Sequence, residues 1–416
     1  MEQLKKSFFW NTIGTSCNAF NSLFFMIAVT RINGVDNAGV FTIAFSTACI
    51  IYIIGLYSGR IYQVTEPNKE ITNKDYIANK SITTLLMIVI VVLFCLIKRY
   101  EAFKFTIFVL LTMYKAFEAF SDVFYGILQK NNKLDKVGKS LFFKSVLSII
   151  LFVVTDIITK NIIFSIIVML LVNIVLLVMY DIKNSKQYIE KDSKVNFNNI
   201  INIFKLGFFT FIISLLGMYI LNAPKYAIDN YLEDNYQTIF GIIVMPATVI
   251  GLVAQFLIHP YLNSILELYE KRDSKGFYKI IMKLILSIIV IGVISSILAY
   301  LLGPEVLGII YGIDLKTYRW DLFIIIIAST LYTIGVIYSS VLTTIRDTFS
   351  QFIIYICITI FALIVSNYLT KSNKMEGAVI AYFIIMLLQF LAYSIYANVK
   401  IKRIFKKAKM LDYKEK

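Results

Sequence analysis

Apolar runs of about 20 residues recur along the whole chain, and their length constrains the fold more than any other feature. A helix of this length crosses the hydrocarbon core of a bilayer and satisfies its backbone hydrogen bonds internally. A transmembrane barrel would instead show alternating segments of about 10 residues. Of the 416 residues, 58% are hydrophobic and only 16% are charged, a balance that no water-soluble protein of this size needs. The sequence therefore predicts an all-α polytopic membrane protein.

Twelve segments reach membrane-spanning length. Two of the breaks between them are very short, one at Lys160 and one at Arg346 and Asp347, and each predicts a tight turn between two helices. The predicted spans are 8–30, 38–59, 80–97, 104–128, 141–159, 161–180, 203–223, 237–259, 280–302, 320–345, 349–369 and 376–398.

The longest polar segment between spans separates two halves of six spans each. Because each half has an even number of spans, both halves begin on the same side of the membrane, as in parallel repeats. The sequence predicts an N-terminal six-helix lobe at 1–182, a cytoplasmic linker at 183–202 and a C-terminal six-helix lobe at 203–399. A basic tail follows at 400–416.

The basic residues indicate the orientation of the chain. With the N-terminus inside, the inner loops and termini hold 27 Lys and Arg residues and the outer side holds 10. The positive-inside rule then predicts that both termini are cytoplasmic. The formal net charge is +15, and the tail carries eight of the basic residues. In this context we expect the tail to set topology and to interact weakly with anionic membrane lipid, and we expect no nucleic-acid partner.

The predicted span 104–128 carries a stripe of polar and charged residues: Lys115, Glu118, Asp122, Tyr125 and Gln129. Their spacing places all five on one face of a helix. A charge at mid-bilayer depth costs about 3 kcal/mol, so this face should look onto protein or water rather than lipid. One interpretation is a face that lines a polar central cavity for substrate or ions. The other is that Lys115 and Glu118 form a self-neutralising pair, which would leave Asp122 over.

Three more charged residues are candidates for the same cavity. Lys225 follows Pro224 at the end of the seventh predicted span, where proline should bend or stop the helix, and Asp229 lies one turn further on. Arg60 closes the second predicted span. Lys225 and Arg60 could equally be interfacial anchors at helix ends.

No catalytic constellation is visible in the sequence. His259 is the only histidine and stands beside Pro260, which is typical of a residue at a helix end. The four cysteines lie within apolar runs without metal-ligand spacing, and no phosphate-binding loop of the full Gly-x-x-x-x-Gly-Lys-Ser/Thr pattern is present. The sequence thus predicts neither an enzyme nor a cofactor or metal site, and transport would draw on an ion gradient, on the substrate gradient or on partners.

Three stretches resemble the Wzx-type oligosaccharide flippases of the multidrug/oligosaccharidyl-lipid/polysaccharide exporter (MOP) superfamily. The resemblance covers essentially the whole chain in length and in number of spans. The three stretches are 38–41 with 59–65 and 75–77, 114–126 with Gln129, 134–135 and 138–140, and 222–229 with 240–241, 245–246 and Pro260.

The resemblance implies two six-helix bundles in a MATE-like V around a central cavity. It implies alternating access that moves undecaprenyl-diphosphate-linked oligosaccharide repeat units across a bacterial cytoplasmic membrane for capsule or exopolysaccharide synthesis, with a polymerase and chain-length machinery as possible partners. By position, Lys115, Lys225 and Arg60 match the cationic cavity residues that hold the diphosphate in such families. Glu118, Asp122 and Asp229 match their counter-charges, and Glu118 and Asp122 also suit ion coupling.

Two other functions fit the sequence less well. A cation-coupled multidrug or small-solute exporter of the same fold would act on soluble cations without a lipid carrier. A membrane enzyme such as a repeat-unit polymerase or ligase would need a large outer loop with catalytic or sugar-binding residues, and the outer loops here are short.

Overall fold

The computed structural model describes residues 2–57, 59–65, 70–190 and 193–412. Within these ranges all regular structure is helical and no strand occurs, which confirms the predicted all-α class. The chain divides into two compact units, Met1–Met218 and Tyr219–Lys416. The boundary falls within helix α9 (Phe197–Tyr231).

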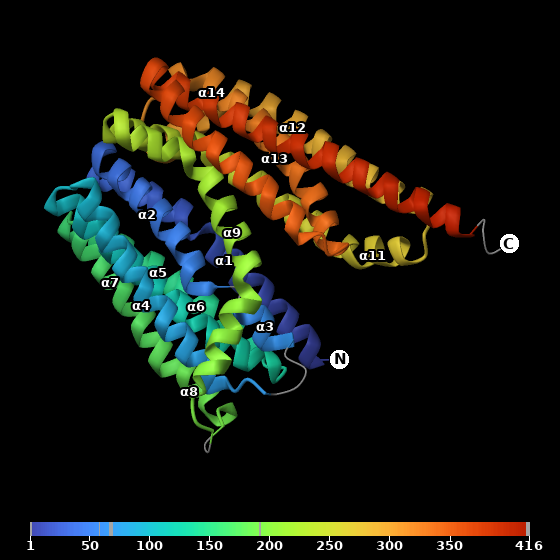
Figure 1. The fold of residues 1–416 in the computed structure, drawn as a ribbon. Coiled ribbons are helices and arrows are strands. Elements are labelled where there is room, and N and C mark those ends of the chain that lie inside the picture. Colours follow the sequence, from blue (N-terminus) through green and yellow to red (C-terminus); the bar gives the residue numbers. More distant parts are fainter. Residues whose placement is uncertain (1, 58, 66–69, 191–192, 413–416) are drawn as a thin grey trace. The chain divides into compact units, whose positions relative to one another are not determined.

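The first unit is a bundle in which α1 packs along α6, and α5 packs against both α2 and α4 (Figure 1). Its elements, before the first part of α9, are α1 (Glu2–Asn33), α2 (Val35–Leu56), α3 (Gly59–Thr65), α4 (Asn73–Lys98), α5 (Ala102–Lys130), α6 (Leu134–Thr159), α7 (Ile162–Leu176), the π-helix η1 (Leu177–Ile182), α8 (Lys183–Ser185) and the 3-10 helix η2 (Lys186–Tyr188).

Small residues and aromatic rings explain how these helices pack. A Cβ atom on Gly14 would lie 2.2 Å from the carbonyl oxygen of Gly138, so α1 and α6 approach at backbone distance because both residues are glycine. Deeper in the bundle the rings of Phe25 and Phe152 lie 5.1 Å apart, and Phe41 packs edge-on against Phe25. These buried rings form the apolar core around which the polar site is built.

Helix α4 begins with a capping box. Thr72 is the N-cap, its hydroxyl accepts from the Asp75 backbone N–H, and the Asp75 carboxylate accepts in return from the Thr72 backbone N–H. The second Asp75 oxygen accepts from the backbone N–H of Asn196 at 2.7 Å. One side chain thus starts α4 and fastens the segment before α9 to it.

The second and third helices are separated by a sharp break. Helix α2 ends at Leu56, and Tyr57 adopts the left-handed conformation with φ 43°. The Tyr57 hydroxyl donates to the carbonyl of Phe204, and its ring stacks on Phe211 at 4.4 Å. The break redirects the chain so that α3 packs on α5.

The second unit consists of the rest of α9 followed by long helices, of which α13 packs against both α12 and α14 (Figure 1). Its elements are α10 (Asp234–Ile258), the 3-10 helix η3 (His259–Tyr261), α11 (Leu262–Glu270), α12 (Ser274–Tyr311), the 3-10 helix η4 (Lys316–Tyr318), α13 (Arg319–Thr344) and α14 (Thr348–Asp412). Non-helical dihedral angles at Asn373 and Lys374 divide α14 into two.

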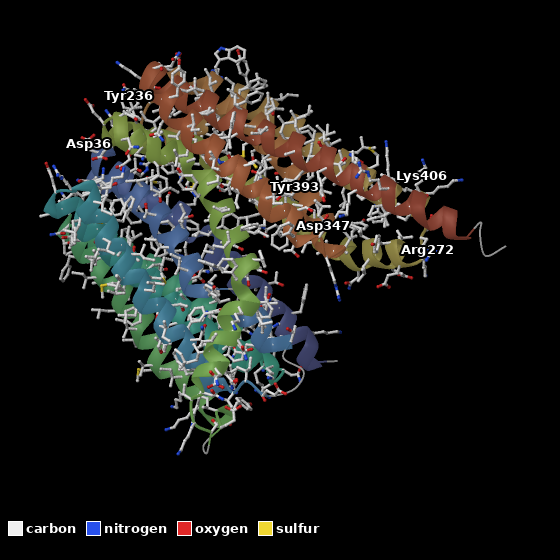
Figure 2. All side chains as sticks on the ribbon, viewed as in Figure 1. Asp36, Tyr236, Arg272, Asp347, Tyr393 and Lys406 are labelled. Carbon is white, nitrogen blue, oxygen red and sulfur yellow. The ribbon has the colours of Figure 1, made fainter. Side chains whose placement is uncertain are left out.

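The helices of this second unit alternate in direction, so the segments that connect them lie at its two ends. Tyr236 lies at one end, Tyr393 lies buried between the ends, and Asp347, Arg272 and Lys406 lie toward the other end (Figure 2). These last three residues belong to the predicted cytoplasmic side. The predicted order of spans places all three on the same side of the membrane. Which side faces the cytoplasm stays a prediction.

The helices match the predicted spans closely. Ten helical segments of the described residues are long and apolar enough to cross a membrane. One of them, α14, contains two predicted spans. The remaining predicted span is α5, a continuous helix that carries several charged residues and is not among the ten. Both predicted tight turns are confirmed, because Lys160 lies between α6 and α7, and Arg346 and Asp347 lie between α13 and α14.

Pro224 was predicted to bend or stop its helix, and the structure excludes the stop. Helix α9 continues through Pro224 to Tyr231. The predicted lobe limits at 182 and 203 differ from the division at Met218, and part of the predicted linker forms α8 and η2. The lobe limits stay a prediction, and 191–192 and 413–416 lie outside the described residues.

Candidate functional site

Helix α5 presents the predicted polar face to the interior of the first unit. Lys115, Glu118, Asp122, Tyr125 and Gln129 all lie on this one continuous helix. Counted over the whole residue, Glu118, Asp122 and Tyr125 are each less than 10% exposed. Buried charges at such positions need partners, so the chemistry of the site depends on what surrounds each one.

The Lys115–Glu118 pair is closed on itself. Lys115 Nζ lies 2.7 Å from Glu118 Oε2, and the Asn18 amide donates to Glu118 Oε1 at 3.1 Å. Both carboxylate oxygens therefore have a donor. The ammonium also lies within 5.5 Å of three ring centres, those of Phe45, Tyr52 and Tyr114. Of the two interpretations of this pair, the geometry matches the self-neutralising one.

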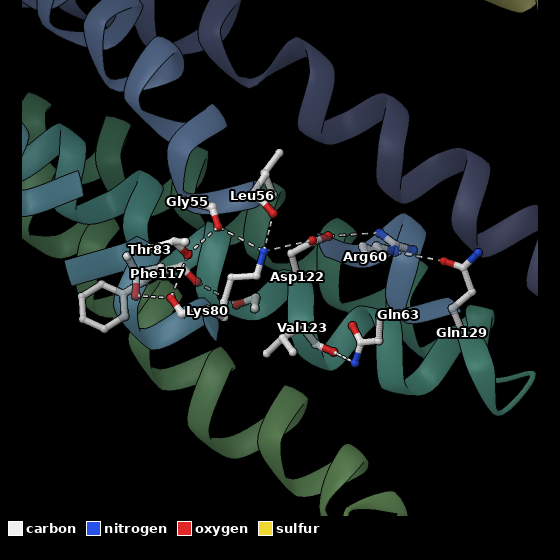
Figure 3. A network of polar contacts seen from close by, with 12 residues as sticks. Gly55, Leu56, Arg60, Gln63, Lys80, Thr83, Phe117, Asp122, Val123 and Gln129 are labelled. Atoms are coloured by element: carbon white, nitrogen blue, oxygen red, sulfur yellow. Dashed lines mark hydrogen bonds and ion pairs between the residues drawn. The ribbon is translucent and has the colours of Figure 1, made fainter. Parts of the chain in front are cut away.

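Asp122 is not left over, because two cations share it (Figure 3). Arg60 Nη1 lies 3.5 Å from Oδ1, and Lys80 Nζ lies 3.6 Å from Oδ2. Lys80 also donates to the carbonyls of Gly55 at 3.1 Å and Leu56 at 2.8 Å. These carbonyls belong to the last turn of α2, where no intrahelical donor is available. Lys80 is only 3% exposed, so it is fixed inside the bundle.

Arg60 is the most accessible charged group of this cluster. Its side chain is 28% exposed, against 12% for Asp122 and 3% for Lys80. The guanidinium donates through Nε to Gln129 Oε1 at 2.9 Å and lies 5.8 Å from the centre of the Tyr125 ring. Gln129 and Tyr125 orient the guanidinium without cancelling its charge, which leaves a partly open cation with a planar fork of donors.

A glycine sets the distance between α3 and α5. A Cβ atom on Gly126 would lie 2.0 Å from Gln63 Oε1, so the Gln63 side chain fits against α5 only because residue 126 lacks a side chain. Gln63 also donates to the carbonyl of Val123 at 3.2 Å (Figure 3). This contact holds α3 in the register that places Arg60 beside Asp122.

A second buried network meets the polar face at Tyr125. Lys144 Nζ lies 2.5 Å from Asp181 Oδ2 and donates to Ser121, while Ser140 donates to Asp181 Oδ1 at 2.6 Å. The Tyr125 hydroxyl lies 3.0 Å from Ser140 Oγ. Because the Ser140 proton goes to the carboxylate, Tyr125 is the donor in that contact. The Lys144 ammonium also lies 5.5 Å from the centre of the Tyr125 ring, so this ring has Arg60 and Lys144 as neighbours.

These contacts leave one positive charge in excess. The charged groups joined by the ion pairs described above are four cations, Arg60, Lys80, Lys115 and Lys144, and three carboxylates, Glu118, Asp122 and Asp181. Four minus three gives a formal charge of +1. The arrangement can therefore attract one anionic group, and Arg60 is the cation that such a group can reach.

The sequence reasoning missed Lys80, Lys144, Asp181 and Asn18. Lys144 lies within the predicted span 141–159, so an isolated cation in an apolar run was the available signal. Lys80 and Asp181 fall at the ends of predicted spans and looked like boundary residues. Asp181 lies on the π-helix η1. The wider turn of a π-helix is a local distortion that occurs often at functional sites and cannot be predicted from a sequence pattern.

Lys225 and Asp229 belong to the second unit. Both lie on α9, one helical turn apart, and the Gln237 amide donates to the carbonyl of Lys225. Their predicted place in a substrate cavity, like that of the α5 face, stays a prediction.

Comparison with solved structures identifies the fold. An inward-facing multidrug resistance MATE family transporter of the MOP superfamily superposes with a TM-score of 0.70 at 14% identity, covering 95% of this chain and 99% of that one. The chain has the MATE transporter fold.

Other structures with the MATE fold agree. An outward-facing multidrug resistance MATE family transporter gives a TM-score of 0.60 at 14% identity, covering 97% of this chain and 96% of that one. The MATE transporter VcmN of Vibrio cholerae in its bent form gives 0.58 at 11% identity, covering 97% and 98%. Together with the apolar helices, the MATE fold makes this a multi-pass membrane protein.

A curated relative adds a biological context to the MATE fold. The chain is 26% identical over 334 residues to the capsular polysaccharide biosynthesis protein CapF of Staphylococcus aureus, which covers 78% of this chain and 81% of CapF. No protein-family model matches the chain.

Proposed function

We propose that the chain is a membrane transporter that flips undecaprenyl-diphosphate-linked oligosaccharide repeat units across the bacterial cytoplasmic membrane for surface polysaccharide synthesis. The observation that carries the proposal is the positive excess centred on Arg60, which is partly exposed on a helix bundle of membrane-spanning length. The MATE fold and the similarity to a capsular polysaccharide biosynthesis protein support it.

The chemistry of the substrate fits this site. A diphosphate bound to hydroxylated sugars cannot enter hydrocarbon, because removing even one charge from water costs several kcal/mol. A cation that bears several N–H donors replaces part of the lost hydration of the phosphate oxygens. The polyprenyl chain needs no such site, since it can stay in the lipid during transport.

The roles of the other charged residues follow from their pairing. In this proposal Arg60 contacts the diphosphate, and Lys225 and Asp229 are further candidate substrate-binding residues. Glu118 is held by Lys115 and Asn18, so its predicted part in ion coupling requires that this pair opens. The flipped repeat units would pass to a polymerase and its chain-length machinery on the outer side, with both termini of the transporter in the cytoplasm.

Reconstitution tests the proposal directly. The full chain is placed in proteoliposomes with a fluorescently labelled polyprenyl-diphosphate disaccharide, and chemical quenching reports the fraction of label that crosses the bilayer. We expect flipping that depends on the protein and on the diphosphate, with no flipping of the corresponding polyprenyl-linked sugar without phosphate. Uptake of a cationic dye driven by an ion gradient, together with no lipid flipping, would support the multidrug exporter instead.

A further inference from the structure

We infer that Lys80 is a positioning residue that keeps Arg60 available to an anionic substrate by holding the carboxylate of Asp122. This inference rests on the proposed function, because the anion is the diphosphate of the lipid-linked substrate. It concerns a buried lysine that does not contact the substrate. Lys80 acts on the substrate only through Asp122 and Arg60.

The first argument is how the carboxylate divides its contacts. An isolated arginine beside a carboxylate forms two short parallel hydrogen bonds of about 2.7–2.9 Å, which neutralise both groups. Here Arg60 Nη1 lies 3.5 Å from Oδ1 of Asp122, longer than such hydrogen bonds, while Lys80 Nζ lies 3.6 Å from Oδ2. Arg60 therefore has a loose contact with the carboxylate, and the trio carries two positive charges against one negative.

The second argument is that Lys80 is held independently of the carboxylate. It donates to the carbonyls of Gly55 and Leu56 in the last turn of α2, and the Thr83 hydroxyl donates to the same Gly55 carbonyl at 3.0 Å (Figure 3). The partial negative charge at that helix end stabilises the ammonium where it is. Lys80 is thus fixed, and Asp122 is drawn toward it.

The third argument is the different exposure of the two cations. Lys80 is 3% exposed and cannot reach a ligand, whereas Arg60 is 28% exposed and is oriented by Gln129 and Tyr125. Without Lys80, the buried Asp122 would have Arg60 as its remaining cation and would bind it in the tight two-oxygen geometry. The trio would then be neutral, and an incoming phosphate would have to break that pair.

The inference gives a definite order of affinities. Lys80→Met should weaken binding of a polyprenyl diphosphate by about tenfold or more, because the phosphate now competes with Asp122 for Arg60. The double variant Lys80→Met with Asp122→Asn should return to within about threefold of wild type, since the competing carboxylate is gone. Asp122→Asn alone should bind at least as tightly as wild type. Lys271→Met, which removes an exposed lysine in the second unit, is the matched control.

Affinity for a short-chain polyprenyl diphosphate is measured with the full chain in lipid nanodiscs, and thermal unfolding is measured on the same samples. Recovery of binding in the double variant, with every variant still folded at the temperature of the binding measurement, supports the inference. Wild-type affinity in Lys80→Met, or a well-folded double variant that stays weak, overturns it while the proposed function stands. A wild-type protein that does not bind the diphosphate in preference to the matching polyprenol overturns both.

Discussion

Arg60 Nη1 lies 3.5 Å from Asp122 Oδ1, and this contact joins the short helix α3 to the charged face of α5. It turns a stripe of charges on one helix into a site built from several helices. Because the pair is loose and Arg60 remains 28% exposed, the contact orients the guanidinium more than it neutralises it.

Arg60→Gln should lower the rate of lipid-linked oligosaccharide flipping by about tenfold or more, because it removes the one accessible cation of the cluster. Arg60→Lys should retain part of the activity, since it keeps the charge but loses the Nε contact to Gln129. Flipping in proteoliposomes measures both. Equal rates for wild type and the Gln variant would exclude Arg60 as the phosphate contact.

Lys115→Met should destabilise the protein by about 3 kcal/mol, because it leaves the buried Glu118 without its cation. The double variant Lys115→Met with Glu118→Gln should recover most of the loss, since no unpaired charge remains. Chemical unfolding in detergent checks both. A stable single variant with defective transport would show instead that Lys115 acts on the substrate.

Tyr125 allows the hydroxyl and the ring to be tested separately. Tyr125→Phe loses the hydrogen bond to Ser140 and should cost about 1 kcal/mol of stability while transport continues. Tyr125→Leu also removes the ring beside Arg60 and Lys144 and should cost a further 1 kcal/mol or so. We expect only the Leu variant to slow flipping, and equal slowing by both variants would contradict a role for the ring.

Gly138→Ala should strongly destabilise the first unit, because the added Cβ atom would lie 2.2 Å from the backbone of Trp10 and α1 cannot move without disturbing the whole contact. Gly251→Ala is the matched control, since nothing beyond the adjacent backbone of its own helix lies within 4 Å of the Cβ position there. We expect the control to be neutral or to stabilise by about 0.5–1 kcal/mol, as alanine favours helix. Thermal unfolding in detergent distinguishes the two.

Asp347 should make the stability of the second unit depend on pH. Burial raises the pKa of this carboxyl, but hydrogen bonds from Ser350, Lys400 and Tyr396 outweigh it and lower the pKa below its usual value. A lowered folded-state pKa gives stability that is present above the ordinary pKa of about 3.9 and is lost as the pH falls through the folded value.

Asp347→Ala should therefore unfold at a lower temperature than wild type at pH 7, by an amount that corresponds to about 1–2 kcal/mol. The difference should shrink as the pH falls below about 4, where the unfolded chain takes up the proton first and the folded carboxyl follows at lower pH. A difference that stays constant from pH 7 to pH 3 would mean that the ion pair and hydrogen bonds of Asp347 do not stabilise the fold.

The sequence was sufficient to predict the helices and the polar face of α5. Hydrophobic length marks a membrane helix without reference to neighbours, and the spacing of Lys115, Glu118 and Asp122 places them on one face through helix geometry alone. The turns at Lys160 and at Arg346 and Asp347 were predictable for the same reason, because a charge or two in a long apolar run is a local signal. Of the two predicted effects of Pro224, a stop is excluded, because proline disfavours helix locally but the helix continues through it.

The partners of these charges were decided only by tertiary structure. Nothing in the sequence shows that Lys80 on α4 and Arg60 on α3 share Asp122, or that Lys144 and Asp181 meet beside Tyr125. Such pairs depend on how closely helices pack, and that depends on glycines such as Gly126 and on backbone breaks such as Tyr57. The positions of the charges along each helix can be read from the sequence. Helix packing selects which charges cancel and which one stays accessible, because Coulomb energies depend on distances between helices.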